Sequence, residues 1–128
     1  MILVDTCIWV NHLRSAYGPM QRLLDAEGVA VHPYITGELA IGNLKQRSLI
    51  LTALAQLPQI MPVLDEEVLL FIEKNSLHGK GLSYVDAHLL ASARLSSCLL
   101  WTEDKKLKEV AADMQLDAAD YIAGCELH

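Results

Sequence analysis

Four acidic side chains in this sequence stand in apolar surroundings and could do chemistry: Asp5, Glu38, Asp86 and Asp104. Asp5 ends an apolar run at the N-terminus, and Asp104 follows an apolar run that begins at Cys98. Glu38 and Asp86 each lie within a largely apolar helical segment. Acids in such settings either cap a helix or bind a metal ion. Which of these roles they have decides what the protein does.

Helix capping accounts for three of the four acids. Asp5 and Asp104 each precede a predicted helix, where a carboxylate oxygen accepts a hydrogen bond from the first backbone N–H groups. Ser83 and Asp86 have the spacing of a capping box. Glu38 is harder to explain in this way, because its neighbours are mostly small or apolar and predict a segment that packs inward.

Short apolar strands alternate with helices along the chain. We expect strands over residues 2–5, 29–31, 60–64 and 98–102, and a last weak strand over 116–121. Predicted helices cover residues 6–14, 20–27, 36–43, 48–57, 65–77, 83–95 and 105–114. The alternation predicts an α/β fold with three layers, α/β/α, around a central, mainly parallel sheet of four to five short strands. The length fits a single domain over residues 1–128.

The predicted topology gathers the acids. A parallel sheet has its ligand site beyond the carboxyl ends of its strands, and Asp5 and Asp104 both follow such an end. If the helices that carry Glu38 and Asp86 begin at the same edge, four carboxylates meet in one crevice. Neighbouring like charges disfavour one another's ionised forms, and a divalent cation relieves that repulsion. All-oxygen ligation suits Mg²⁺ or Mn²⁺, and no His/Cys spacing typical of zinc competes with it.

The composition narrows the class of protein. The net charge of −6 argues against general adhesion to nucleic acid, so that any polyanion must be held locally. No apolar stretch reaches the ~18 residues of a membrane helix, and we find no signal-peptide pattern. We therefore expect a cytoplasmic protein with no membrane contact. The segment over residues 48–57 is apolar nearly all round and is a candidate partner contact.

The surroundings of the four acids resemble the signature segments of PIN-domain ribonucleases. These segments are residues 3–6, 36–39, 83–91 and 102–107, and they occur in the order and at the spacing of that family. Within the family, the chain resembles the small, stand-alone VapC-like toxins of toxin–antitoxin pairs. Two positions depart from the pattern: Cys7 stands where Asn or Ser is frequent, and Leu107 where an aromatic residue is common.

The resemblance implies a PIN-like fold and a metal-dependent endoribonuclease that hydrolyses RNA phosphodiester bonds. The catalytic residues, which also bind one or two Mg²⁺ or Mn²⁺ ions, would be Asp5, Glu38, Asp86 and Asp104. Thr102 matches a Ser/Thr that helps to order the site in the family, and we expect Thr6 to support the acids similarly. Family members are commonly homodimers, are silenced by a cognate antitoxin protein and often cut transfer or ribosomal RNA.

Two lysines are candidate contacts for RNA phosphates that flank the site. Lys80 lies in the loop before the helix of Asp86, and Lys105 directly follows Asp104. The alternative for both is an ordinary solvated surface.

Two other functions remain open from the sequence. A PIN-like module without catalytic activity could bind a partner only. A receiver-type phosphoacceptor domain is also a small α/β fold with acids at strand ends, but it would need paired acids after the first strand, where this chain has only Asp5 followed by Thr6.

Overall fold

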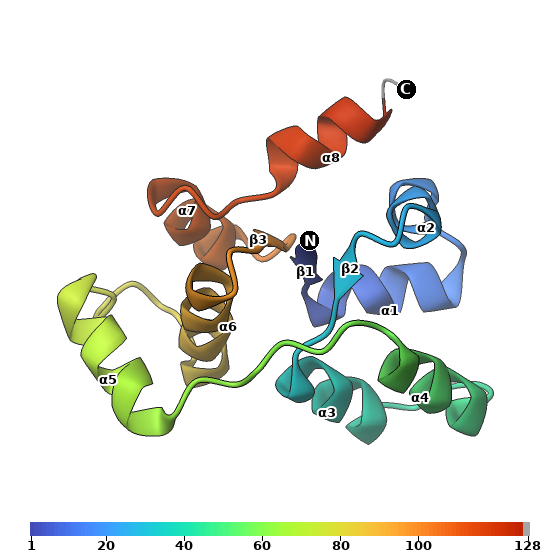
Figure 1. The fold of residues 1–128 in the computed structure, drawn as a ribbon, viewed down its shortest axis with the longest axis horizontal. Coiled ribbons are helices and arrows are strands. Elements are labelled where there is room, and N and C mark those ends of the chain that lie inside the picture. Colours follow the sequence, from blue (N-terminus) through green and yellow to red (C-terminus); the bar gives the residue numbers. More distant parts are fainter. Residues whose placement is uncertain (127–128) are drawn as a thin grey trace.

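Three short parallel strands form the centre of the molecule, in the order β2-β1-β3 (Figure 1). The computed structural model describes residues 1–126, so the predicted domain end at residue 128 lies outside them. The strands are β1 (Ile2–Val4), β2 (Val29–Ala30) and β3 (Leu99–Trp101). Ile2 pairs with Val29 on one side and with Leu99 on the other. All three residues of β1 are buried, as expected for the middle strand of a covered parallel sheet.

The fold class is confirmed, but the sheet has three strands where the sequence predicted four to five. The predicted strands over residues 60–64 and 116–121 are wrong; each is replaced by a single bridge, Val31 with Gln59 and Leu100 with Asp117. The first cannot continue far, because Pro62 has no N–H to donate to a neighbouring strand. The second ends at once, because a helix begins two residues later.

Eight helices occur in the described part of the chain. The seven predicted helices are found with ends that differ by at most three residues: α1 (Thr6–Arg14), α2 (Gly18–Asp25), α3 (Pro33–Ile41), α4 (Arg47–Gln56), α5 (Asp65–Lys74), α6 (Tyr84–Leu95) and α7 (Lys105–Asp113). The eighth, α8 (Ala119–Glu126), was not predicted. No helix within residues 1–126 has both the length and the apolar character needed to cross a bilayer.

The helices form layers on both sides of the strands. Figure 1 shows α1 to α4 on one side and α5, α6 and α7 on the other. Helix α6 packs against β3 and α5, and it is buried without interruption from Ala87 to Ala93. Its leucines and those of the sheet form the centre of the core, where Leu3, Leu89, Leu90 and Leu100 are fully buried. This packing fixes the carboxyl ends of β1 and β3 against the start of α6.

Helix α4 is less buried than its apolar sequence predicts. Leu54 is buried in the core and Ile50 and Leu51 are partly buried, but Leu49 is 64% exposed. A partner contact through this helix stays a prediction.

Candidate functional site

The four predicted acids line one open cleft at the carboxyl edge of the sheet, which we call the acid cleft. Asp5 directly follows β1, and Asp104 follows β3 after two intervening residues. Glu38 comes from α3 and Asp86 from the first turn of α6. The cleft has a volume of about 670 Å³. The structure thus places these carboxylates together, as the topology predicts, while their chemical roles stay a prediction.

Three of the four carboxylates also cap helices. Oδ1 of Asp5 accepts a hydrogen bond from the Thr6 N–H at 2.8 Å, and Oδ1 of Asp104 accepts one from the Leu107 N–H at 3.0 Å. Asp86 and Ser83 form the predicted capping box, with both bonds at 3.0 Å. A carboxylate has about four lone-pair sites, so one capping bond leaves it able to bind a further ligand. Capping and ligand binding are therefore compatible here.

Thr102 forms hydrogen bonds with two of the acidic residues, Asp5 and Asp104. Its hydroxyl donates to Oδ2 of Asp5 at 2.6 Å and accepts a hydrogen bond from the Asp104 N–H at 3.0 Å. The side chain is completely buried, so these bonds are shielded from water. Thr6 makes a similar contact, because its hydroxyl donates to Oε1 of Glu38 at 2.9 Å. Both threonines that the sequence singled out therefore orient a carboxylate of the acid cleft.

Cys7 also contacts the acid cleft. Its Sγ lies 3.8 Å from Oδ2 of Asp5, toward which the thiol donates, and 4.0 Å from the hydroxyl oxygen of Thr102. Burial raises the pKa of the Cys7 thiol, and the charge of Asp5 raises it further. The thiol therefore stays protonated and acts as a weak hydrogen-bond donor. Although Cys7 departs from the family pattern, its thiol still donates to Asp5, more weakly than a hydroxyl would.

The charges of the cleft act on one another. Burial raises the pKa of Asp86 above its ordinary value, and the nearby charges of Asp104 and Asp5 add to the shift. Hydrogen bonds from Ser83 act in the opposite direction but do not cancel it. Ionisation of Asp86 therefore costs free energy in the folded protein, and a bound cation would offset that cost.

The chemistry of the donor set fits a hard divalent cation, because the four acids offer oxygen atoms alone. However, no group of three or more His, Cys, Asp or Glu side chains among the described residues is arranged as it stands to hold a metal ion. The four-acid metal site therefore stays a prediction.

The cleft contains two polar residues that the sequence did not single out as part of a site. Glu103 lines it beside Asp104, and Ser83 lines it beside Asp86. Their adjacency to predicted site residues was the available signal. The predicted RNA contacts Lys80 and Lys105 do not line the acid cleft; Lys80 lines a neighbouring cavity, and Lys105 is the first residue of α7.

Two histidines of the described chain have structural surroundings. His32 and His88 are fully buried. Nδ1 of His32 accepts a hydrogen bond from the Tyr34 N–H, and burial lowers the pKa of His32 to about 4. Nε2 of His88 lies 2.9 Å from Oδ1 of Asp65. Neither ring lines the acid cleft.

Comparison with known proteins places the chain in a family. The model of the PIN domain matches residues 2–113. The chain is 41% identical over 124 residues to Ribonuclease VapC32 of Mycobacterium tuberculosis, a match that covers 96% of this chain and 100% of the relative.

Solved structures share the fold at low sequence identity. FitAcB from Neisseria gonorrhoeae matches with a TM-score of 0.61 and 22% identity, over 88% of this chain and 94% of that one. PAE2754 from Pyrobaculum aerophilum matches with a TM-score of 0.64 and 16% identity, over 99% of this chain and 90% of that one. These likenesses show the fold alone. The match to the PIN-domain model and the identity to Ribonuclease VapC32 show that the chain belongs to the PIN-domain family, as a VapC-like member.

Proposed function

We propose that this protein is a metal-dependent endoribonuclease that hydrolyses RNA phosphodiester bonds, and that it is the toxin of a toxin–antitoxin pair. The observation that carries the proposal is the acid cleft, where four carboxylates from separate parts of the chain line one opening. The name of the relative Ribonuclease VapC32 supports the same reaction. The cleft is open, which suits a polymer better than an enclosed small molecule.

We assign four residues to catalysis and to binding of one or two Mg²⁺ or Mn²⁺ ions: Asp5, Glu38, Asp86 and Asp104. Asp5 and Asp104 are the best candidates for direct ligands, because Thr102 contacts both and fixes one relative to the other. Glu38 and Asp86 either coordinate directly or orient water. When bound, the divalent cation supplies Lewis acidity and a nucleophile at neutral pH.

The chain itself contributes rigid positioning. The Thr102 hydroxyl holds one oxygen of Asp5, and the Thr6 hydroxyl holds one oxygen of Glu38. The capping bonds tie Asp5 and Asp104 to the starts of α1 and α7. Because Thr102 and Leu107 are buried, Asp5 and Asp104 do not have to be ordered when the substrate binds, which lowers the entropic cost of the reaction.

The partners follow from the family resemblance. We propose transfer or ribosomal RNA as the substrate, a cognate antitoxin protein as the inhibitor, a homodimer as the assembly and the cytoplasm as the location. Exposed apolar side chains support protein partners, since several large ones are 58–80% exposed on α5 and in the segment before it. They are Met61, Leu64, Leu69 and Leu70.

The test is incubation of the purified full-length chain with a pool of small RNAs, with and without Mn²⁺. The Asp5→Asn variant is run in parallel to identify contaminating nucleases. Cuts that need Mn²⁺ and disappear in the variant support the proposal. Equal cleavage by both proteins, or no cleavage by either, overturns it; the latter result together with retained antitoxin binding would indicate a module without catalytic activity.

A further inference from the structure

A buried histidine connects the helix that carries Glu38 with the helix that carries Asp86. His32 directly precedes α3, and Ser92 lies in the second half of α6. Nε2 of His32 lies 3.1 Å from Oγ of Ser92, and both side chains are completely buried. We call this contact the His32–Ser92 link. Because α3 and α6 belong to opposite layers of the fold (Figure 1), the link joins the two layers.

Both ring nitrogens of His32 are used, each for a different contact. Nδ1 accepts a hydrogen bond from the Tyr34 N–H at 3.0 Å, which caps the first turn of α3. An accepting Nδ1 carries no proton, so in the neutral ring Nε2 carries it and donates to Oγ of Ser92. Burial, and then the charge of His88, lowers the pKa of His32 to about 4, so the ring is neutral at pH 7. One side chain thus fixes both the start of α3 and its contact with α6.

Capping alone does not explain a histidine at position 32. Serine, threonine, aspartate and asparagine are the strongly preferred residues before a helix, and their short side chains bond to the N–H groups of that helix. The imidazole ring has nitrogen atoms on two sides and reaches partners in two helices. A buried polar pair also adds little net stability, since replacing both partners with apolar groups can be nearly neutral. The pair is therefore better explained by the orientation it imposes than by stability.

The link lies at the same sequence separation from both acids. Glu38 follows His32 by six residues (32 to 38), and Asp86 precedes Ser92 by six (86 to 92). At a rise of 1.5 Å per residue, each acid lies ~9 Å along its helix from the link. A tilt of α3 by about 5° at His32 would therefore shift Glu38 by about 0.8 Å. Such a shift exceeds the roughly 0.5 Å within which a functional group must be held.

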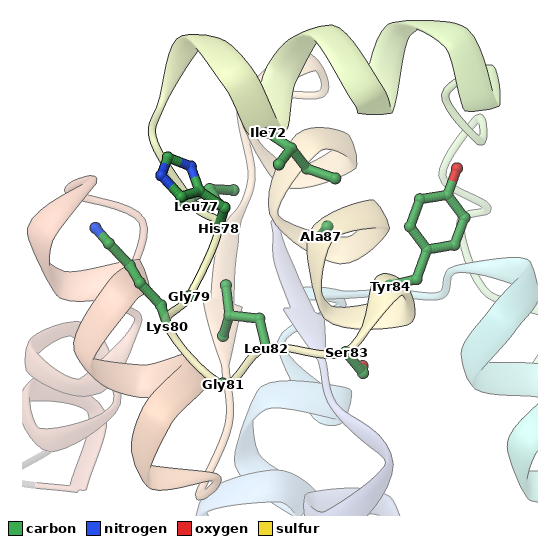
Figure 2. A pocket seen from close by; sticks show the side chains of 10 residues that line it. All are labelled: Ile72, Leu77, His78, Gly79, Lys80, Gly81, Leu82, Ser83, Tyr84 and Ala87. Atoms are coloured by element: carbon green, nitrogen blue, oxygen red, sulfur yellow. The ribbon is translucent and has the colours of Figure 1, made fainter.

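Helix α6 is held on its other side by α5. The Tyr84 hydroxyl donates to Oδ1 of Asp65 at 2.8 Å, and Nε2 of His88 lies 2.9 Å from the same oxygen. Figure 2 shows the Tyr84 side chain on the side of α6 away from Lys80 and the loop between α5 and α6. Because α6 is fixed on α5, the link determines how α3 lies relative to the start of α6. The exposed bond from Thr6 to Glu38 is a weaker restraint, since water competes for it.

We propose that His32 is a positioning residue of the acid cleft, which through Ser92 sets the distance between Glu38 and Asp86 and so the affinity for the divalent cation. The inference rests on the proposed function and deepens it, because it names a residue outside the cleft on which metal binding depends. His32 does not line the cleft. Its contribution is to hold α3 against α6 before the cation and the substrate bind.

The test measures Mn²⁺ binding to the full-length chain by calorimetry, without RNA. Ser92→Ala removes the acceptor of the link and leaves the cap of α3 intact. We expect Mn²⁺ binding to weaken about threefold to tenfold, less than the roughly 10–100-fold that loss of a direct partner of a metal ligand costs. His32→Asn keeps an acceptor at the place of Nδ1 but does not reach Ser92, and should weaken Mn²⁺ binding equally. Because both changes break the same link, the double variant should bind no more weakly than either single variant.

Two further variants separate positioning from stability. His32→Gln places an amide donor where Nε2 stands and loses the cap, so it should lower Tm yet retain the Mn²⁺ affinity of the wild type. His12→Asn is the matched control, because Nδ1 of His12 also accepts a backbone hydrogen bond, from the Tyr17 N–H at 3.0 Å, but His12 does not line the acid cleft. It should leave Mn²⁺ affinity unchanged. In long-range ¹H–¹⁵N spectra of the wild type, we expect the proton of His32 on Nε2.

The outcomes separate the two proposals. If the wild type cuts RNA and binds Mn²⁺, but Ser92→Ala and His32→Asn bind Mn²⁺ as tightly as His12→Asn, the ribonuclease proposal stands and the positioning role is overturned. Additive losses in the double variant, or a proton on Nδ1 of His32, also overturn the positioning role alone. If the wild type binds no Mn²⁺, both proposals are overturned.

Discussion

Aspartates at the starts of helices occur in two regions of this molecule, with opposite surroundings. At the start of α5, Oδ1 of Asp65 accepts a hydrogen bond from the Tyr84 hydroxyl at 2.8 Å and lies 2.9 Å from Nε2 of the buried His88. These partners, the tyrosine most of all, lower the pKa of Asp65 below its ordinary value. The protein itself supplies what this carboxylate needs in its ionised form.

In the acid cleft the direction is reversed. Burial and then the charges of Asp104 and Asp5 raise the pKa of Asp86, and no basic side chain lines the cleft to oppose them. The fold thus satisfies the ionised form of Asp65 but leaves that of Asp86 destabilised, as expected where a cation from outside is to be bound. Perturbed titration of this kind is typical of functional sites. The local charge balance, and not the helix-start position, therefore distinguishes the acids that we propose to be catalytic from Asp65.

The strongest test of this contrast compares two identical substitutions. Asp5→Asn removes a charge that the proposed metal ligation needs, and we expect RNA cleavage to fall by more than the roughly 10–100-fold that removal of a residue supporting a metal ligand costs. Asp65→Asn keeps an acceptor for the Tyr84 hydroxyl and should leave the cleavage rate unchanged. Initial rates at saturating Mn²⁺ give the comparison. Equal reductions in the two variants would contradict the assignment of Asp5.

Thr102 offers the next largest effect, because it connects Asp5 to Asp104. Thr102→Val has nearly the same shape but no hydroxyl, and we expect a decrease of about 10–100-fold in activity or in metal affinity. Thr102→Ser restores the hydroxyl and should recover most of both. Metal affinity is measured by the Mn²⁺ concentration at half-maximal cleavage. Full activity of the valine variant would show that the buried hydrogen bond does not position the acids.

The opposite pKa shifts predict opposite pH dependences of stability without a divalent cation. The lowered pKa of Asp65 stabilises the fold above its unfolded value near 3.8, and this contribution is lost as the pH falls through the folded value. The raised pKa of Asp86 has the other sign: stability is lost as the pH rises from about 3.8 through the folded value. At pH 7, Asp65→Asn should therefore lower Tm, whereas Asp86→Asn should raise it.

The difference for Asp86→Asn should shrink as the pH falls toward 3.8, whereas the difference for Asp65→Asn should persist to about that pH and shrink below it; thermal melts across both ranges measure them. Addition of Mn²⁺ should raise the Tm of the wild type by more than that of Asp86→Asn. A variant at position 86 that melts below the wild type at neutral pH in the presence of a chelator would overturn this interpretation of the cleft.

The sequence predicts the elements that position the acids better than those at the periphery. β1 is a continuous apolar run, and α6 is a mostly apolar segment after a clear cap, so their local pattern and their burial agree. The two outer strands exist only as bridges at Gln59 and Asp117, whose extent depends on tertiary contacts. Helix α8 was missed although Oδ1 of Asp117 accepts a hydrogen bond from the Ala119 N–H, because the apolar alternation around it resembles a strand.

In the candidate site, too, some features could be predicted from the sequence and others could not. Asp5 and Asp104 could be found because strand ends are readable in the sequence and a parallel topology brings such ends to one edge. The packing of Lys106 on Gly81 and the sharing of Ser83 between two cavities depend on how the loop after α5 lies against α7. No local pattern encodes that arrangement, so the neighbouring cavity is visible only in three dimensions.

The substitution Cys7→Ser changes a single atom beside Asp5 and so tests the contrast between the acid cleft and Asp65. Its thiol is a weak donor to Oδ2 of Asp5 at 3.8 Å, and Cys7→Ser replaces it with a hydroxyl, which is a better donor but has a shorter bond to its Cβ. If the hydroxyl reaches Asp5, that carboxylate becomes more like Asp65, satisfied by the protein. A net hydrogen bond contributes ~1 kcal/mol, so the Tm in chelator should rise by a few degrees. The rise in Tm on addition of Mn²⁺ should become smaller, because less repulsion is left to relieve.

Cys7→Ala is the matched control: it removes the donor and should lower Tm in chelator while leaving the Mn²⁺ effect at least as large as in the wild type.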